Sequence, residues 1–338
     1  METEIQKGLL SLYEKCRLCP RRCGVNRIRG EKGFCVERDE MRVGYVGPHF
    51  GEEPPLTGEN GSGTVFLSGC SLRCSYCQNH QISRQGLGRK TDAQKLALEL
   101  DSLVNDQKVH NINFVTPDHF LPHIFMTISL FKEKRTDIPV IFNVSGYQST
   151  QMLRMSADHV DIYLPDFKYS DSLLAERLSG AGDYPGTALD AISEMVNQKG
   201  FMDVLPDSST ASRGVLVRHL ILPGKVANSI NALNCLFLEF GKGLPLSIMS
   251  QYRPVVKNRE KDLNRTVYAS EFYQVYNHAM ELGFENLYVQ FPDKETTEEV
   301  RSRDFLPDFS LTGPFDKGGP AGPSDEPAKT SKSTAYPI

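Results

Sequence analysis

Three cysteines lie close together in the segment 69–79, and their spacing decides what chemistry they could do. Cys70, Cys74 and Cys77 are separated by three residues and then by two. They directly follow the apolar run 64–67, which predicts a β-strand. The three thiolates would therefore sit on one tight loop at the end of that strand.

Three thiolates on one loop can hold three corners of a [4Fe–4S] cluster, whereas ordinary clusters are held by four. The fourth iron would be left open for a small molecule. A structural zinc ion closes its shell with four ligands, and the spacing also departs from the Cys-x-x-Cys pairs of zinc knuckles and redox motifs. We interpret the trio as cluster ligands rather than as a chance group of core or zinc-binding cysteines.

The sequence around the trio resembles the radical S-adenosylmethionine (SAM) enzymes. The resemblance rests on Cys70-x3-Cys74-x2-Cys77 with the aromatic Tyr76 before the last cysteine. The flanking residues Phe66-Leu67-Ser68-Gly69 and Gln78-Asn79 are similar to those of pyruvate formate-lyase activating enzymes and of their relatives, the PflX-like Fe–S proteins. The resemblance implies that SAM binds the open iron of the cluster.

A second set of cysteines precedes the trio, with the pattern Cys16-x2-Cys19-x3-Cys23-x11-Cys35. Four thiolates brought together by loops rich in Gly and Pro satisfy either an iron–sulfur cluster or a zinc ion. Neighbouring arginines would favour the thiolate form. An auxiliary cluster, a structural zinc knuckle and no metal at all remain open. The PflX-like proteins have a similar segment, which does not decide the metal.

Composition limits the classes of protein. The chain has 338 residues, enough for one barrel-sized domain with extensions, and a net charge of −4 that makes nucleic acid an unexpected partner. It contains no apolar run of membrane-spanning length, and its acidic N-terminus is unlike a signal peptide. Seven of the eight cysteines fall in metal-like spacings in the first 77 residues. We therefore expect a cytoplasmic protein with metal ligands rather than disulfides.

Apolar runs alternate with stretches of helical periodicity from residue 64 onward. The expected strands are 64–67, 112–116, 139–144, 160–164, 215–222, 244–249 and 286–289. The expected helices are 92–105, 119–131, 149–155, 173–178, 187–199, 227–240 and 269–282. Such alternation predicts an α/β fold with a parallel sheet buried on both faces.

An open or partial barrel fits this alternation, and a doubly wound sheet also satisfies it. The resemblance implies a partial (β/α)6 barrel of the radical SAM type. We divide the chain into a Cys-rich metal-binding extension (1–57), the radical SAM core (58–312) and a disordered tail rich in Gly, Pro and Ser (313–338). Residues 43–63 are expected to be loops, with His49 and Glu52 in solvent.

Polar residues are expected at the carboxyl ends of the strands, where parallel barrels place reactive groups. The resemblance implies that Tyr76 flanks the adenine of SAM. It also implies that Asn143, Asp166 and Lys168 lie near the SAM carboxylate and ribose, and that Arg218 approaches the cofactor. The residue-level alternatives are a turn residue for Asn143 and a weak surface ion pair for Asp166 and Lys168.

One position departs from the family pattern. Activating enzymes carry Gly-Gly-Glu after the second strand, where it receives the SAM amino group, but this chain has Phe114-Val115-Thr116-Pro117-Asp118. The Thr116 hydroxyl, backbone carbonyls or Asp118 would have to substitute. For Asp118 we favour a plain helix cap. His219 suits a substrate contact and a core position equally.

The resemblance implies that the reduced cluster cleaves SAM to methionine and a 5′-deoxyadenosyl radical, which abstracts hydrogen from a substrate. It also implies an electron donor such as flavodoxin or ferredoxin and, by analogy, a glycyl residue of a partner enzyme as target. Two other hypotheses remain. One is a radical SAM enzyme acting on a small molecule or RNA, and the other is a non-catalytic zinc-binding interaction protein.

Overall fold

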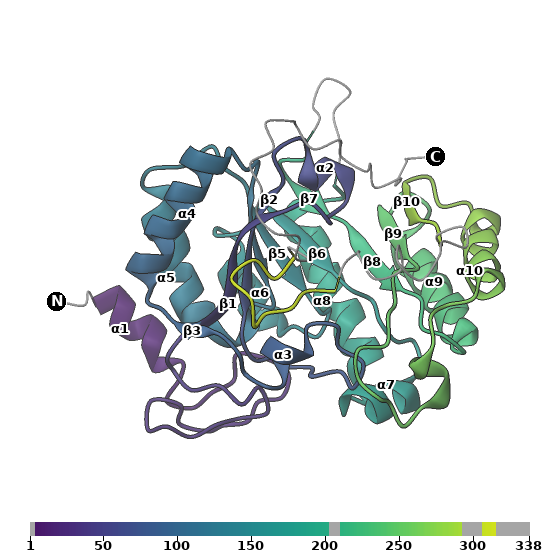
Figure 1. Ribbon diagram of the computed structural model, residues 1–338, viewed down its shortest axis with the longest axis horizontal. Helices are drawn as coiled ribbons and strands as arrows, with labels where there is room; N and C mark the ends of the chain where they lie inside the picture. The colour runs from purple at the N-terminus through teal and green to yellow at the C-terminus, as the bar shows by residue number, and fades with distance from the viewer. Residues whose placement is uncertain (1–3, 203–209, 293–305, 316–338) are drawn as a thin grey trace.

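The computed structural model describes residues 4–202, 210–292 and 306–315. Its strands are β1 (Arg42–His49), β2 (Ser62–Leu67), β3 (Arg89–Lys90), β4 (Ile112–Val115), β5 (Val140–Val144), β6 (Ile162–Pro165), β7 (Gly214–Val215), β8 (Val217–Leu220), β9 (Leu246–Met249) and β10 (Leu287–Gln290). They form a sheet in the order β3-β1-β2-β4-β5-β6-β7 and a second in the order β10-β9-β8 (Figure 1). Each expected strand corresponds to one of these strands or, for 215–222, to two.

The fifth expected strand divides at Leu216 and thereby connects the two sheets. Its first part, β7, pairs with β6, whereas its second part, β8, pairs with β9. Backbone hydrogen bonds still join the two sheets, because Phe167 N donates to Arg218 O over 2.8 Å. The parallel strands β2 and β4 to β10 therefore form one curved wall, which confirms the α/β fold and the partial barrel.

The helices are α1 (Glu4–Ser11), α2 (Pro54–Thr57), α3 (His80–Ser83), α4 (Ala93–Gln107), α5 (Leu121–Lys132), α6 (Thr150–Ser156), α7 (Ser172–Ser179), α8 (Tyr184–Lys199), α9 (Val226–Phe240) and α10 (Ala269–Leu282), with short 3-10 turns η1 (Asp118–Phe120) and η2 (Lys261–Asn264). The longer helices cover the outer side of this wall, whereas the four-residue helices α2 and α3 do not (Figure 1). Asp92 caps α4 by accepting a hydrogen bond from Lys95 N. Each expected helix is present within a few residues of its expected bounds.

The expectation of loops over residues 43–63 is wrong. Residues 42–49 form β1, which pairs antiparallel with β2, and α2 follows it. Many glycines and prolines suggested loops, but pairing with a buried neighbouring strand outweighs weak local propensity. The consequence is that the chain after β1 enters the barrel at the end opposite the cysteine loop.

The Cys-rich extension packs at the carboxyl end of the strands. Arg27 is fully buried there, donating to the carbonyl oxygens of His119 and Arg38, with its guanidinium 4.3 Å from the centre of the Tyr13 ring. Arg21 donates to Ser71 O over 3.0 Å and to Ser179 O over 2.7 Å. These two arginines therefore fasten the extension to the barrel instead of forming an exposed basic patch.

Two sequence expectations concern the chain ends. Gly313, Pro314 and Phe315 are described although the tail was expected to begin at residue 313, and residues 316–338 lie outside the described residues. The division into extension, core and tail stays a prediction. No described helix combines the length and the apolar character that crossing a membrane would require.

Candidate active site

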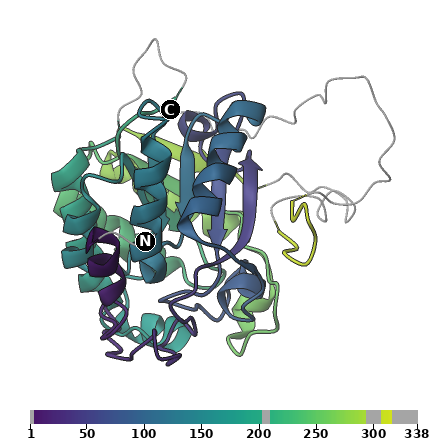
Figure 2. The same ribbon diagram turned by 90° about the vertical axis from the view of Figure 1, so that its left-hand side faces the viewer.

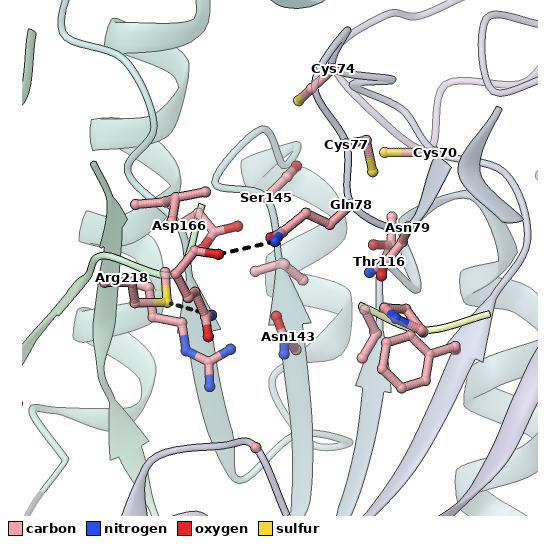
Figure 3. Close-up of a pocket in the computed structure, with 18 of the residues that line it drawn as sticks. Cys70, Cys74, Cys77, Gln78, Asn79, Thr116, Asn143, Ser145, Asp166 and Arg218 are labelled. Carbon is pink, nitrogen blue, oxygen red and sulfur yellow. Dashed lines mark hydrogen bonds between the residues drawn. The ribbon is translucent and has the colours of Figure 1, made fainter. Parts of the chain in front are cut away.

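One cavity of about 250 Å³ opens beside the cysteine loop and extends into the barrel (Figure 3). Its size is near the lower end of the roughly 300–1,000 Å³ of ligand pockets. Its lining includes the cysteine trio and every residue expected from the sequence to bind SAM: Cys70, Cys74, Cys77, Tyr76, Thr116, Asn143, Asp166, Lys168 and Arg218. The structure therefore brings these nine side chains together from five separate parts of the chain.

The three thiols face this cavity from the loop between β2 and α3 (Figure 3). Leu72 N donates to Cys70 Sγ over 3.3 Å, and the Ser83 hydroxyl donates to Cys77 Sγ over 3.2 Å. Burial raises the pKa of the Cys70 thiol to about 12 and also raises the pKa of Cys77. A positively charged metal centre would offset this cost of forming thiolates. The donor set thus fits an iron–sulfur cluster.

Within the described residues, no three His, Cys, Asp or Glu side chains converge as the ligands of a single metal ion would. A cubane cluster makes a different demand, because each of its thiolates binds a separate iron at its own corner. The side chains of the trio consequently suit a cluster better than a single ion.

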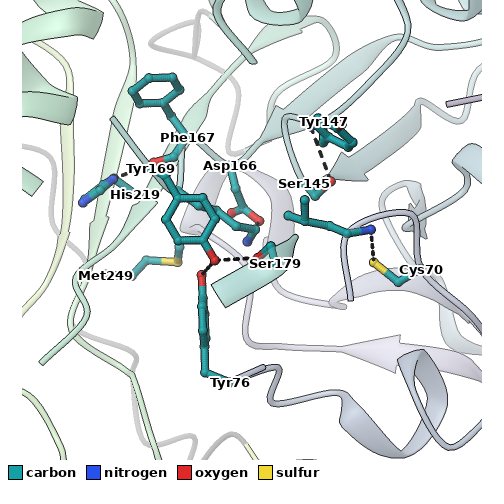
Figure 4. A network of polar contacts seen from close by, with 12 residues as sticks. Cys70, Tyr76, Ser145, Tyr147, Asp166, Phe167, Tyr169, Ser179, His219 and Met249 are labelled. Carbon is teal, nitrogen blue, oxygen red and sulfur yellow. Dashed lines mark hydrogen bonds and ion pairs between the residues drawn. The ribbon is translucent and has the colours of Figure 1, made fainter. Parts of the chain in front are cut away.

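A tyrosine pair forms the wall next to the trio (Figure 4). Tyr169 Oη donates to Tyr76 Oη over 2.9 Å and also lies 2.7 Å from Ser179 Oγ. Burial raises the pKa of both phenols well above the usual value, so both stay neutral. Tyr76 is therefore a fixed, uncharged aromatic surface at the edge of the cavity.

Asp166 and Lys168 form a close ion pair at the end of β6. The alternative of a weak surface pair is wrong, because their side chains are only 18% and 17% exposed. Burial works to lower the pKa of Lys168, but the Asp166 carboxylate outweighs it and raises that pKa. Lys168 is therefore a protonated amine held at the cavity wall.

Thr116 stands at the departure from the Gly-Gly-Glu pattern. Its φ angle is +57°, a conformation that glycine adopts readily and a β-branched residue rarely does. Its backbone N–H donates to the carbonyl of Asn143 over 2.9 Å. Asp118 is not a helix cap: its buried carboxylate accepts a hydrogen bond from Gln148 Nε2 over 3.0 Å, beside Ser71. Local capping preference here gives way to a buried polar contact.

The deepest part of the cavity contains a charged cluster that sequence reasoning missed. Arg218 donates through Nε to both oxygens of Glu53, over 2.9 and 3.1 Å, and through Nη2 to Glu52 and Glu53. Glu52 also accepts from Asn113 over 3.0 Å and lies 3.4 Å from Asn143 Nδ2. The expectation of Glu52 in solvent is wrong, because β1 carries this segment into the barrel. A Glu-Glu-Pro-Pro sequence has no feature that would have indicated this.

The other residues weighed for this region fall into two groups. His49 lies at the cavity, against the Phe66 ring, and not in a solvated loop. His219 is fully buried and its Nδ1 donates to Phe167 O over 2.6 Å, which makes it a core residue (Figure 4). Further lining residues that the sequence did not single out are Ser145, Gln251, Met249, Pro307 and Phe315.

The second cysteine set lies outside the cavity but touches the loop of the first. Cys16, Cys19 and Cys35 are buried, and Cys23 is exposed and accepts a hydrogen bond from Phe34 N. A Cβ at Gly69 would lie only 3.0 Å from Cys35 O. Because Gly69 precedes Cys70, the two cysteine loops are in direct backbone contact.

Two comparisons with known sequences support the interpretation of the cavity and its cysteine trio as an iron–sulfur site. Residues 56–184 match the family described as "4Fe-4S single cluster domain". The uncharacterized protein MJ0674 of Methanocaldococcus jannaschii is 27% identical over 299 residues, which cover 84% of this chain and 77% of that protein. The pyruvate formate-lyase-activating enzyme of Clostridium pasteurianum is 26% identical over 164 residues, covering 47% of this chain and 61% of the enzyme.

Solved structures with similar backbones are more distant. SuiB of Streptococcus suis bound to S-adenosylmethionine has a TM-score of 0.45 at 12% identity, covering 68% of this chain. HydG, a maturase of the [FeFe]-hydrogenase, has a TM-score of 0.48 at 13% identity, covering 70% of this chain. The chain spans 52% of each of these two structures. The cysteine motif, the matching family and the sequence relatives make the chain similar to radical SAM enzymes, with distant similarity to the pyruvate formate-lyase-activating enzyme.

Proposed function

We propose that this protein binds a [4Fe–4S] cluster on Cys70, Cys74 and Cys77 and uses it to cleave SAM reductively. The observation that carries the proposal is the single cavity in which the trio meets the polar residues expected to hold SAM. The chemistry that the bound cluster supplies is one-electron cleavage of SAM to methionine and a 5′-deoxyadenosyl radical, which takes hydrogen from a substrate. A low-potential donor such as flavodoxin or ferredoxin would supply the electron.

The protein's own side chains would bind and orient SAM. Tyr76 offers an aromatic surface for the adenine. The protonated Lys168, held by Asp166, is suited to the SAM carboxylate, and Asn143 to the ribose hydroxyls. Thr116 and the backbone around it would receive the amino group. Arg218 already binds two carboxylates, so we propose that it shapes the floor of the site without touching SAM.

We further propose a protein substrate, with a glycyl residue of a partner enzyme as the target. The similarity to the activating enzyme of C. pasteurianum supports this choice. The quartet is proposed as the site of an auxiliary iron–sulfur cluster, with zinc as the alternative. The burial of three of its four thiols, those of Cys16, Cys19 and Cys35, in a segment rich in loops supports this proposal.

The test is anaerobic reconstitution of the full chain, followed by iron and zinc analysis and an assay for 5′-deoxyadenosine with dithionite and SAM. We expect about four irons on the trio and about eight if the quartet binds a second cluster. Cys74→Ala should abolish deoxyadenosine formation. Cys235→Ala, which changes a cysteine outside both sets, should leave it intact. Zinc without iron, or equal activity in both variants, would refute the proposal.

A further inference from the structure

The described segment Leu306–Phe315 lies across the side of the barrel that the helices leave uncovered. In Figure 2 the helices flank the strands on one side, and this yellow segment lies beyond β1 on the other. Figure 1 shows the same segment in front of the strands. Pro307 and Phe315 form part of the cavity lining, together with Cys77 and Gln78. The segment therefore closes the side entrance of the proposed active site.

Part of its attachment to the barrel is polar and is made by Gln81 of α3. Phe309 N donates to Gln81 Oε1 over 2.8 Å, and Gln81 Nε2 donates to Asp308 Oδ1 over 2.9 Å. Gln81 lies only four residues after Cys77. A side-chain amide that binds a backbone N–H recognises a polypeptide as such, whatever its side chains.

Another part of the attachment is aromatic. Phe309 and Phe315 lie against Phe66, with ring centres 5.4 and 5.5 Å apart. Phe315 also contacts His49, at 4.5 Å, and Tyr45, at 5.5 Å. The three residues of the barrel that the segment contacts here, Tyr45, His49 and Phe66, come from β1 and β2. We call them, together with Gln81, the entrance surface.

The segment has its own internal structure and so behaves as one unit. Asp308 N donates to Pro314 O over 2.8 Å, which closes a turn. The Asp308 carboxylate accepts from Ser310 N over 3.0 Å and from Ser310 Oγ over 2.7 Å. A preformed turn that is attached by one amide and a few rings can leave the entrance as a whole without disturbing the core.

We propose that Leu306–Phe315 is a removable plug and that the entrance surface binds a polypeptide segment bearing an aromatic side chain in its place. The inference rests on the proposed function, because it names the substrate class of that site. Backbone recognition by Gln81 beside an aromatic platform is the chemistry by which peptides are bound in grooves. Docking of the substrate polypeptide and opening of the cavity then become the same event.

The first test measures the position of the plug without any cluster. The chain contains no tryptophan, so Phe315→Trp introduces a single tryptophan, which can be excited apart from the tyrosines. Leu311→Trp is the matched control, because Leu311 lies in the same segment and is 51% exposed. Acrylamide should quench Phe315→Trp at least three-fold less than Leu311→Trp. Adding Gln81→Ala should remove that protection, and equal quenching of the two single variants would overturn the plug.

The second test measures peptide binding by fluorescence anisotropy, with a labelled synthetic peptide of sequence Leu-Pro-Asp-Phe-Ser-Leu-Thr-Gly-Pro-Phe as the probe. A full-length Phe309→Ala/Phe315→Ala variant leaves the entrance surface vacant and should bind this peptide. The unchanged protein should bind it at least ten-fold more weakly, because its tethered plug competes at a high effective concentration. Circular dichroism checks that the double variant is folded. Adding Gln81→Ala to the double variant should weaken its binding of the peptide.

A control peptide with serine at both phenylalanine positions should not bind. Equal binding of the two peptides, or equal binding by the variant and the unchanged protein, would overturn the peptide site. Neither measurement needs iron or SAM cleavage. A protein that forms no deoxyadenosine but passes both tests would refute the proposed function and leave the entrance surface established. A protein that forms deoxyadenosine but fails both tests would refute the peptide site and leave the proposed function standing.

Discussion

Arg218 and Glu53 form an ion pair inside the barrel, in which Arg218 Nε lies 2.9 and 3.1 Å from the two carboxylate oxygens of Glu53. Both side chains are less than a tenth exposed. Glu52 adds a second carboxylate to the same guanidinium. The strand end that carries Arg218 is thereby joined to the chain that follows β1, two parts of the sequence separated by 165 residues.

Removing the cation from this pair should be costly. Arg218→Met leaves two buried carboxylates without their partner, and we expect a loss of about 3–5 kcal/mol in the free energy of unfolding. Urea denaturation measures it. Arg154→Met is the control, because Arg154 pairs with Glu194 while 70% exposed, and should cost less than about 1 kcal/mol. Similar losses in the two variants would mean that the barrel interior admits water.

Gly69 should be the most sensitive contact between the two cysteine loops. It has a φ angle of +81°, and a Cβ there would lie 2.5 Å from Glu37 Cγ. Gly180 has a φ angle of +59° but open space around a Cβ. Alanine at either position costs about 1–2 kcal/mol of backbone strain, and crowding adds about 1–3 kcal/mol at Gly69 only.

Thermal unfolding of Gly69→Ala and Gly180→Ala measures this difference, and metal analysis of both proteins accompanies it. We expect Gly69→Ala alone to lose part of its bound iron, because its Cβ would push the extension away from Cys70. If both variants lost equal stability and retained equal iron, the contact with Cys35 would have no structural role.

Much of this structure could be predicted from local sequence. Apolar runs bounded by polar residues located the parallel strands, because strands buried on both faces leave that pattern. The spacing of Cys70, Cys74 and Cys77 identified the loop at the end of β2. Asn143 and Asp166 were expected among the polar residues at the strand ends, because parallel strands present their carboxyl ends at one edge, and the resemblance to activating enzymes selected them.

The features that were missed depend on contacts between distant residues. β1 is stabilised by its pairing with β2, which glycine- and proline-rich residues 43–63 do not reveal. Glu52 is buried only because Arg218 lies opposite it. Phe315 occurs in the segment expected to be disordered and Phe309 lies just before it, and their partner Phe66 precedes them by more than 240 residues. No local pattern records such pairings.

His219 should make stability depend on pH. Burial lowers the pKa of His219 from the ordinary 6.5 to about 4. Between these values the unfolded chain binds a proton that the folded protein excludes, so stability is complete above pH 6.5 and declines as the pH falls toward 4. The difference of about 2.5 pKa units corresponds to about 3 kcal/mol.

Urea unfolding of the unchanged protein and of His219→Gln between pH 7 and pH 4 tests this expectation. Buried His119 and His123 also have lowered pKa values, of about 3 and about 4, so the variant keeps part of the slope. The stability difference between the two proteins should shrink as the pH falls. A difference that stays constant with pH would show that the pKa of His219 is the same in the folded and the unfolded protein.

Lys168 should contribute to SAM binding through its charge. Replacing it by methionine keeps a side chain of similar length but removes the ammonium group. The loss of a charged hydrogen bond, about 1.5–3 kcal/mol, should weaken the binding of SAM by roughly 10- to 150-fold. Isothermal titration of the reconstituted protein without reductant measures binding apart from turnover.

Lys225→Met is the matched control. Its side chain is equally buried, at 17% exposure, and forms an ion pair with Glu260, but Lys225 is not among the residues that line the cavity. It should leave the affinity for SAM unchanged, because no charge near the cofactor is lost. If both lysine variants weakened SAM binding alike, the effect of Lys168→Met would not be specific to the cavity, and the SAM carboxylate would need another partner.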